Sequence, residues 1–179
     1  MKILTLLRHA KSGWDDGVER DFDRPLNPRG RRAARTVGAE MRAEGLAFDR
    51  IVASPAKRVI ETLDEVAAGY GPLDAIYDER LYLALSETLI DVAREAPKTA
   101  TRLLLVGHNP GLEETALRLT RAGGSLRAEA ELKYPTGTLA EIHLPIESWS
   151  ELRHGVGRLE RFIRPRDLDP ELGPDPDDA

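Results

Sequence analysis

Short apolar runs along the chain alternate with longer segments in which apolar residues are spaced for a helix. The apolar runs cover residues 3–7, 50–53, 103–106 and 139–144. We interpret each run as a strand covered by helices on both faces, because such strands carry apolar residues continuously rather than at alternate positions.

The segments between these runs have helical periodicity. The residues that carry it are Ala33, Val37 and Met41; Ile60, Leu63 and Ala67; Leu85, Leu89, Val92 and Ala96; and Leu112, Ala116 and Leu119. Strands that alternate with helices predict an α/β fold, here a three-layer α/β/α sandwich with a mainly parallel sheet.

Three predicted helices begin with a capping residue followed by proline, at Asn27-Pro28, Ser54-Pro55 and Asn109-Pro110. Proline suits the first helical position, where the backbone N–H has no partner in the helix. Two of these starts directly follow predicted strands. Because ligands bind at the carboxyl ends of strands in open α/β sheets, residues 8–9, 54–58 and 107–109 should meet at one rim.

The composition narrows the class of protein. The 179 residues are 41% hydrophobic and 32% charged, as in a globular protein, and residues 1–168 are predicted to form a single domain. Residues 169–179 are rich in proline and acidic residues, so we expect a disordered tail there.

The absence of cysteine excludes disulfides, thiolate metal sites and cysteine nucleophiles. The net charge of -5 argues against a nucleic-acid partner. No apolar run is long enough for a signal peptide or a membrane span, so we expect a cytoplasmic protein without a membrane partner.

Two histidines and two arginines occupy the predicted rim. A neutral imidazole at His9 can attack phosphorus through one nitrogen while its other N–H is held by a carbonyl. Arg8 and Arg58 can hold phosphate oxygens, and a protonated His108 can donate to another. Phosphoryl transfer needs a nucleophile and cations around three equatorial oxygens, so these four residues predict a phosphatase pocket.

Several segments resemble motifs of the histidine phosphatase superfamily. They are LLRHAKS at residues 6–12, VASPAKRVIET at 52–62, VGHN at 106–109, RPLN at 24–27 and KYPTG at 133–137. The resemblance runs in order over residues 1–168 and is greatest to the SixA-type phosphohistidine phosphatase branch. It implies a phosphoglycerate mutase-like fold, with His9 as the phosphorylated nucleophile and Arg8, Arg58, His108 and Asn109 around the phosphate. The glycine that usually follows the histidine is Ala10 here.

The proton donor and the substrate stay open at this point. The segment around Glu79 resembles the one that supplies an acidic glutamate in related mutases, whereas a phosphohistidine substrate needs less help from an acid. The substrate is a phosphorylated protein or a small phosphorylated molecule. Residues 11–24 are expected to form a loop over the pocket, where Trp14, Asp15 and Asp16 are candidates to contact the leaving group.

Alternatives to a phosphohistidine phosphatase remain. The same pocket would suit a phosphomonoesterase or a pyrophosphatase acting on a small metabolite, or a non-catalytic module that binds a phosphorylated partner. The intact His9 argues against a pure binder. The four histidines lack metal-ligand spacing and the chain has no glycine-rich nucleotide loop, so we expect neither a metal nor a cofactor.

Overall fold

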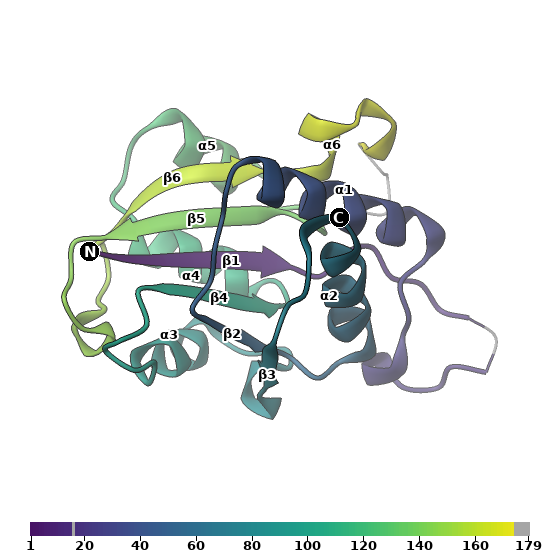
Figure 1. Ribbon diagram of the computed structural model, residues 1–179, viewed down its shortest axis with the longest axis horizontal. Coiled ribbons are helices and arrows are strands. Elements are labelled where there is room, and N and C mark those ends of the chain that lie inside the picture. The colour runs from purple at the N-terminus through teal and green to yellow at the C-terminus, as the bar shows by residue number, and fades with distance from the viewer. Residues whose placement is uncertain (16, 174–179) are drawn as a thin grey trace.

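A computed structural model describes residues 1–15 and 17–173, which fold around one six-stranded sheet (Figure 1). The strands are β1 (Lys2–Arg8), β2 (Arg50–Ala53), β3 (Ala75–Tyr77), β4 (Arg102–Gly107), β5 (Leu139–Leu144) and β6 (Arg158–Ile163). Their order across the sheet is β3-β2-β4-β1-β5-β6. The pairs among β3, β2, β4 and β1 are parallel, and β5 runs antiparallel to both of its neighbours. The predicted α/β sandwich with a mainly parallel sheet is therefore confirmed.

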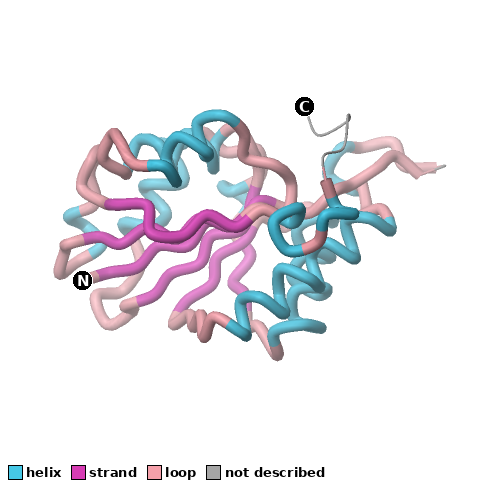
Figure 2. Tube along the Cα trace, turned by 90° about the horizontal axis from the view of Figure 1, so that it is seen from above, coloured by secondary structure: helices cyan, strands magenta, loops and turns pink. Residues whose placement is uncertain are grey.

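The helices cover both faces of the sheet (Figure 2). They are α1 (Pro28–Ala43), α2 (Lys57–Tyr70), α3 (Ser86–Arg94), α4 (Gly111–Leu119), α5 (Ser125–Leu132) and the short α6 (Pro165–Leu168). No helix among the described residues has the length and apolar character needed to cross a membrane.

The continuous apolar runs are explained by the two separate cores that they fill. In β1, Leu4 and Leu6 belong to the core under α3 and α4, whereas Leu7 belongs to the core under α1 and α2. The same division separates Leu103 and Leu105 from Leu104 and Val106 in β4, because successive side chains point to opposite faces of a strand. Trp149 is fully buried near the amino-terminal end of β4, and its indole Nε1 donates to the Ala100 carbonyl at 2.8 Å.

The capped helix starts differ from one another in detail. Asn27 caps α1 as predicted, since its side chain accepts from the Gly30 N–H at 2.8 Å. The second helix begins at Lys57, two residues later than Pro55, and Ser54 accepts a 3.3 Å bond from the Ala56 N–H. The last of the three, α4, begins at Gly111 instead of Pro110, although the Asn109 side chain still accepts from the Glu113 N–H at 3.1 Å.

The expectation of a disordered tail from residue 169 is wrong for its first five residues. Pro170–Leu172 forms a 3-10 turn capped by Asp169, and Leu172 is buried. Arg32 on α1 binds the carboxylates of Asp169 and Glu171, which fixes this segment against the helix. The rest of the predicted tail, residues 174–179, lies outside the described residues.

Candidate active site

The carboxyl ends of β1, β2 and β4 meet at one rim of the sheet. Arg8 in β1 lies beside Gly107 in β4, and Ala53 in β2 lies beside Val106, so the residues that follow each strand are neighbours. A hollow of about 310 Å³ opens there. Its lining consists of Arg8, His9, Lys11, Ser12, Asp21, Arg24, Arg58, Leu83, His108, Asn109 and Thr136. The structure thus brings together the four residues of the predicted phosphate pocket.

His9 is oriented by its own backbone and by its neighbour. Its N–H donates to the Gly107 carbonyl at 3.0 Å and its carbonyl accepts from the Gly137 N–H at 2.9 Å, which fixes the residue between β4 and the start of β5. The ring Nδ1 lies 2.7 Å from the Ala10 carbonyl and must carry the proton, because a carbonyl only accepts. Burial lowers the pKa of His9 well below its usual value, although the Ala10 carbonyl opposes the shift. His9 Nε2 therefore carries the ring's lone pair, and in the structure it accepts a long 3.4 Å bond from Arg58 Nε.

Ala10 itself is fully buried, and its N–H donates to the Thr62 hydroxyl at 2.9 Å. That contact ties the residue after the nucleophile to α2. The Ala10 side chain thus packs within the core beneath α1 and α2.

Arg58 lies in the first turn of α2 and is 2% exposed. Its Nε is 3.4 Å from His9 Nε2, and its Nη2 is 3.2 Å from His108 Nδ1. The outer end of the guanidinium is occupied by Asp21, whose backbone carbonyl accepts from Nη1 at 2.8 Å and whose Oδ2 accepts from Nη2 at 3.0 Å.

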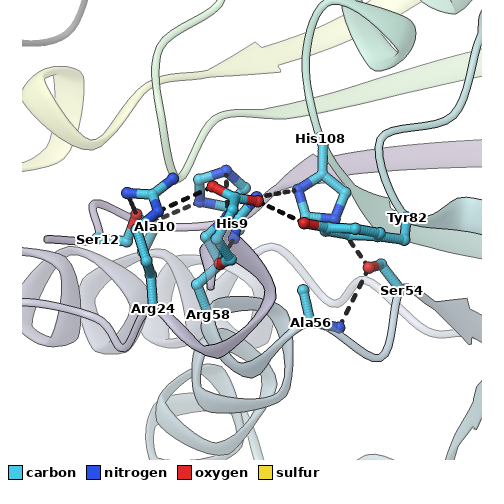
Figure 3. Close-up of polar contacts among 10 residues, drawn as sticks. His9, Ala10, Ser12, Arg24, Ser54, Ala56, Arg58, Tyr82 and His108 are labelled. Carbon is cyan, nitrogen blue, oxygen red and sulfur yellow. Dashed lines mark hydrogen bonds and ion pairs between the residues drawn. The ribbon is translucent and has the colours of Figure 1, made fainter. Parts of the chain in front are cut away.

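His108 is a neutral imidazole in the structure. Its Nδ1 accepts from Arg58, so its Nε2 carries the proton and donates to Ser54 Oγ at 2.8 Å. Burial, together with the positive charge of Arg58, lowers the pKa of His108 to about 3. The two imidazole rings lie 5.3 Å apart between centroids (Figure 3).

Arg8 and Asn109 share one acceptor. The Tyr134 carbonyl accepts from Arg8 Nη1 at 2.9 Å and from Asn109 Nδ2 at 3.0 Å. This carbonyl belongs to the segment that leads into β5. Because β5 is antiparallel to β1, it begins at the end of the sheet where β1 finishes. The segment before β5 therefore supports the pocket as well.

Glu79 does not line the pocket. It is an exposed residue at the start of a 3-10 turn, Glu79–Leu81, and does not belong to the pocket lining. The turn is capped by Asp78, which accepts from the Arg80 N–H, and it is Leu81 that faces the core. The geometry therefore provides no support for Glu79 as general acid.

Asp21, Arg24 and Tyr82 form a hydrogen-bonded group beside Arg58, although none of the three was predicted as a site residue. The Asp21 carboxylate accepts from Tyr82 Oη at 2.6 Å and from Arg24 Nε at 2.9 Å, and Arg24 Nη1 donates to Ser12 Oγ at 2.8 Å. Partial burial raises the pKa of Asp21, but the bonds from Tyr82, Arg58 and Arg24 outweigh it and hold the pKa at about 2. The Asp-x-x-Arg spacing is a signal for this pair, because residues three apart lie together on one helical turn.

The loop over the pocket includes an exposed tryptophan. The Trp14 ring lies 5.3 Å from the Arg24 guanidinium carbon and is 59% exposed. Asp15 is also exposed, and Asp16 lies outside the described residues. Over residues 1–15 and 17–173, no group of three histidine or acidic side chains is arranged to hold a metal ion.

The chain resembles known proteins in sequence. Residues 4–82 match the model of the histidine phosphatase superfamily, branch 1. An uncharacterized protein of Mycobacterium tuberculosis is 36% identical over 163 residues, which cover 89% of this chain and 100% of the relative.

Solved structures share the fold. The candidate phosphohistidine phosphatase SixA of Nakamurella multipartitia has a TM-score of 0.80 at 28% identity, covering 92% of this chain and 96% of that chain. The SixA candidate of Agrobacterium tumefaciens has a TM-score of 0.74 at 30% identity, covering 91% and 97%. The protein histidine phosphatase SixA in complex with tungstate has the same fold, with a TM-score of 0.72 at 20% identity over 93% and 99%. With the Arg8–His9 pair, Arg58 and His108 assembled at the rim of this fold, the chain belongs to the histidine phosphatase superfamily.

Proposed function

We propose that the protein is a phosphatase that works through a covalent phosphohistidine on His9, and that its substrate is a phosphohistidine carried by a protein. The observation that carries the proposal is the orientation of His9. Its Nδ1 proton is held by Ala10 while Nε2 faces Arg58 in a pocket lined by cationic side chains.

In the first step, His9 Nε2 attacks phosphorus, a P–N bond to His9 forms, and the bond to the leaving group breaks. The negative charge on the equatorial oxygens is stabilised by Arg8 and Arg58, and Arg58 is almost fully buried, where such contacts are stronger than in water. A phosphoryl group beside His108 favours the charged form of that imidazole, so His108 becomes a donor when substrate binds.

In the second step, a water oxygen attacks the phosphorus atom on His9, opposite the P–N bond. A new P–O bond forms, the P–N bond breaks, and His9 leaves as the neutral imidazole with which it began. Inorganic phosphate then departs with the proton that water lost. The low pKa of His9 suits both steps, because the neutral ring is the nucleophile as well as the leaving group.

The acid chemistry of the pocket supports phosphohistidine over an alkyl phosphate. Among the described residues that line the pocket, the one carboxylate is Asp21, and its pKa of about 2 means that it holds no proton at neutral pH. An alkoxide leaving group needs a proton donor. A phosphorylated imidazole can instead take a proton from solvent on its second ring nitrogen and leave as a neutral ring.

A comparison of substrates tests the proposal. We expect one preparation to hydrolyse a phosphohistidine peptide faster than p-nitrophenyl phosphate, and both far faster than alkyl phosphates. Labelled substrate should leave a phosphoenzyme that is stable to base and labile to acid. His9→Ala should lose both the label and the turnover, by several orders of magnitude. Fast turnover of a small alkyl phosphate with little on the peptide would favour a metabolite phosphatase instead.

We also propose that the reaction needs no metal. The positive charge comes from Arg8, Arg58 and the neighbouring cations Lys11 and Arg24. Treatment with EDTA, followed by gel filtration, should therefore leave turnover unchanged. An enzyme inactivated by the chelator and restored by magnesium or zinc would contradict this mechanism.

A further inference from the structure

Arg58 has two hydrogen-bonding edges, and the structure divides them between different partners. A guanidinium presents five N–H donors in a rigid plane, with one edge formed by Nε and Nη2 and another by Nη1 and Nη2. The first edge faces His9 Nε2 at 3.4 Å and His108 Nδ1 at 3.2 Å. The second edge is held entirely by Asp21, through its carbonyl and its carboxylate.

The edge that faces the histidines is the one that can turn to a phosphoryl group, because its bonds to His9 and His108 are longer than the bonds of the other edge to Asp21. A phosphorus atom attacked by His9 Nε2 has its oxygens near the Nε and Nη2 donors, and two parallel N–H bonds suit such a group. Asp21 lies at the other edge, so substrate can take the inner donors without displacing the carboxylate. The two bonds to Asp21 limit rotation of the planar guanidinium about the Cδ–Nε bond.

Asp21 is itself fixed from two sides. Tyr82 Oη donates to the same Oδ2 that binds Arg58, and Arg24 Nε donates to the other oxygen. The Tyr82 ring packs edge-on against His108, with centroids 5.4 Å apart, and against Phe22, 5.1 Å apart. Asp21 thus joins the loop over the pocket to α2 and to the segment after β3.

We propose that Asp21 is a positioning residue, which holds the inner edge of Arg58 toward the phosphoryl site and which Tyr82 in turn keeps in place. The proposal concerns how the pocket binds a tetrahedral or trigonal oxyanion. It rests on the proposed function only where turnover is the readout.

The test compares Asp21→Asn and Tyr82→Phe with a control, Asp23→Asn, which lies in the same 3-10 turn, Asp21–Asp23. Asp23 binds exposed Arg20 and does not belong to the pocket lining. Tungstate binding, measured by calorimetry, does not require turnover. We expect Asp21→Asn to raise the dissociation constant of tungstate about tenfold and to lower kcat by roughly tenfold to a hundredfold, the range that a small misplacement of a catalytic group can cost. Asp23→Asn should match wild type in both.

The double variant separates positioning from general stability. Because Tyr82 acts through Asp21, Tyr82→Phe should weaken tungstate binding about threefold in wild type and have no further effect in Asp21→Asn. KM should change less than kcat, since the alignment of Arg58 matters most when charge develops. Thermal unfolding of each variant checks that the fold is retained.

Several outcomes would overturn the proposal. Unchanged tungstate binding in folded Asp21→Asn would remove the positioning role. Tighter binding would mean that the carboxylate competes with the anion. Additive effects in the double variant would deny the link through Tyr82. If wild type binds tungstate but hydrolyses no phosphorylated substrate, the proposed function fails while the binding measurements still decide the role of Asp21.

Discussion

The burial of Arg58 makes its shape as important as its charge. The side chain is 2% exposed, and its donors reach His9, His108 and Asp21 at once. A lysine has one compact ammonium group on a flexible chain, so it cannot donate to the two histidines and to Asp21 in the same fixed geometry.

We therefore expect Arg58→Lys to lower kcat/KM by about a hundredfold or more, although the charge is kept. The measurement is steady-state turnover of a phosphohistidine peptide. Arg80→Lys is the matched control, because Arg80 forms exposed ion pairs with Asp78 and Glu95. Near-normal turnover of Arg58→Lys would show that charge alone suffices.

Glu79 gives the opposite expectation. Since it is exposed and outside the pocket lining, Glu79→Gln should stay within about twofold of wild type on phosphohistidine peptide, p-nitrophenyl phosphate and an alkyl phosphate alike. A loss of about a hundredfold on the alkyl phosphate alone would restore the acid role, because that is the usual worth of general acid catalysis.

At the same scale, sequence motifs identify some pocket residues and not others. His9, Arg8 and His108 directly follow or end apolar strands, so the topology alone predicts that they meet. Asp21 begins a single 3-10 turn, Asp21–Asp23, between β1 and α1, and this turn is too short for a hydrophobic periodicity to indicate which way its side chains point. Its role depends on bonds to Arg58 and Tyr82, which are 37 and 61 residues away in sequence.

Among the secondary-structure elements, the buried strands were predictable and the edge strands were not. β1, β2, β4 and β5 coincide with the apolar runs, within one residue at each end. β3 has three residues that are only partly buried or exposed, and β6 carries charged residues among its apolar ones. Both lie at an edge of the sheet, where one side lacks a neighbouring strand and the hydrophobic pattern is weak.

The contact between α1 and the loop after β1 depends on Gly30. A Cβ at this position would lie 2.0 Å from the Lys11 carbonyl oxygen, so no side chain fits without moving the backbone that follows His9. We expect Gly30→Ala to destabilise the fold by about 1–3 kcal/mol and to lower turnover. Urea unfolding and steady-state kinetics measure the two effects.

Gly13→Ala is the control for this change, since a Cβ there meets nothing closer than the Asn27 Cβ at 4.0 Å. It should leave stability and turnover near wild type. Equal behaviour of the two variants would mean that the loop can shift freely, and that α1 does not support the position of His9.

For the molecule as a whole, the two buried histidines make stability depend on pH. Both have pKa values below 6.5 in the folded state, that of His108 at about 3. The unfolded chain therefore binds more protons as pH falls below about 6.5, and the free energy of unfolding should decrease by about 1.4 kcal/mol per pH unit for each histidine. The depressed pKa of Asp21 adds a further loss between about pH 4 and 2.

Urea unfolding between pH 7.5 and 4.5 tests this dependence. His108→Asn should have a shallower slope than wild type, and His154→Asn, at an exposed position, should not. A slope that is the same in all three proteins would show that other groups control the acid sensitivity.

The two tryptophans lie in opposite surroundings, and this gives the protein two built-in fluorophores. Trp149 is buried near the amino-terminal end of β4, away from the pocket, and its indole is bonded to a backbone carbonyl. Its emission maximum should therefore be blue-shifted and should move to longer wavelength on unfolding. Trp14 is exposed beside Arg24, within the loop that carries Asp21, and its red-shifted emission should respond to what the pocket holds. Replacing Trp14 by phenylalanine leaves Trp149 as the fluorophore that reports global folding. Replacing Trp149 leaves Trp14 as the fluorophore that reports occupancy of the site, without any added label.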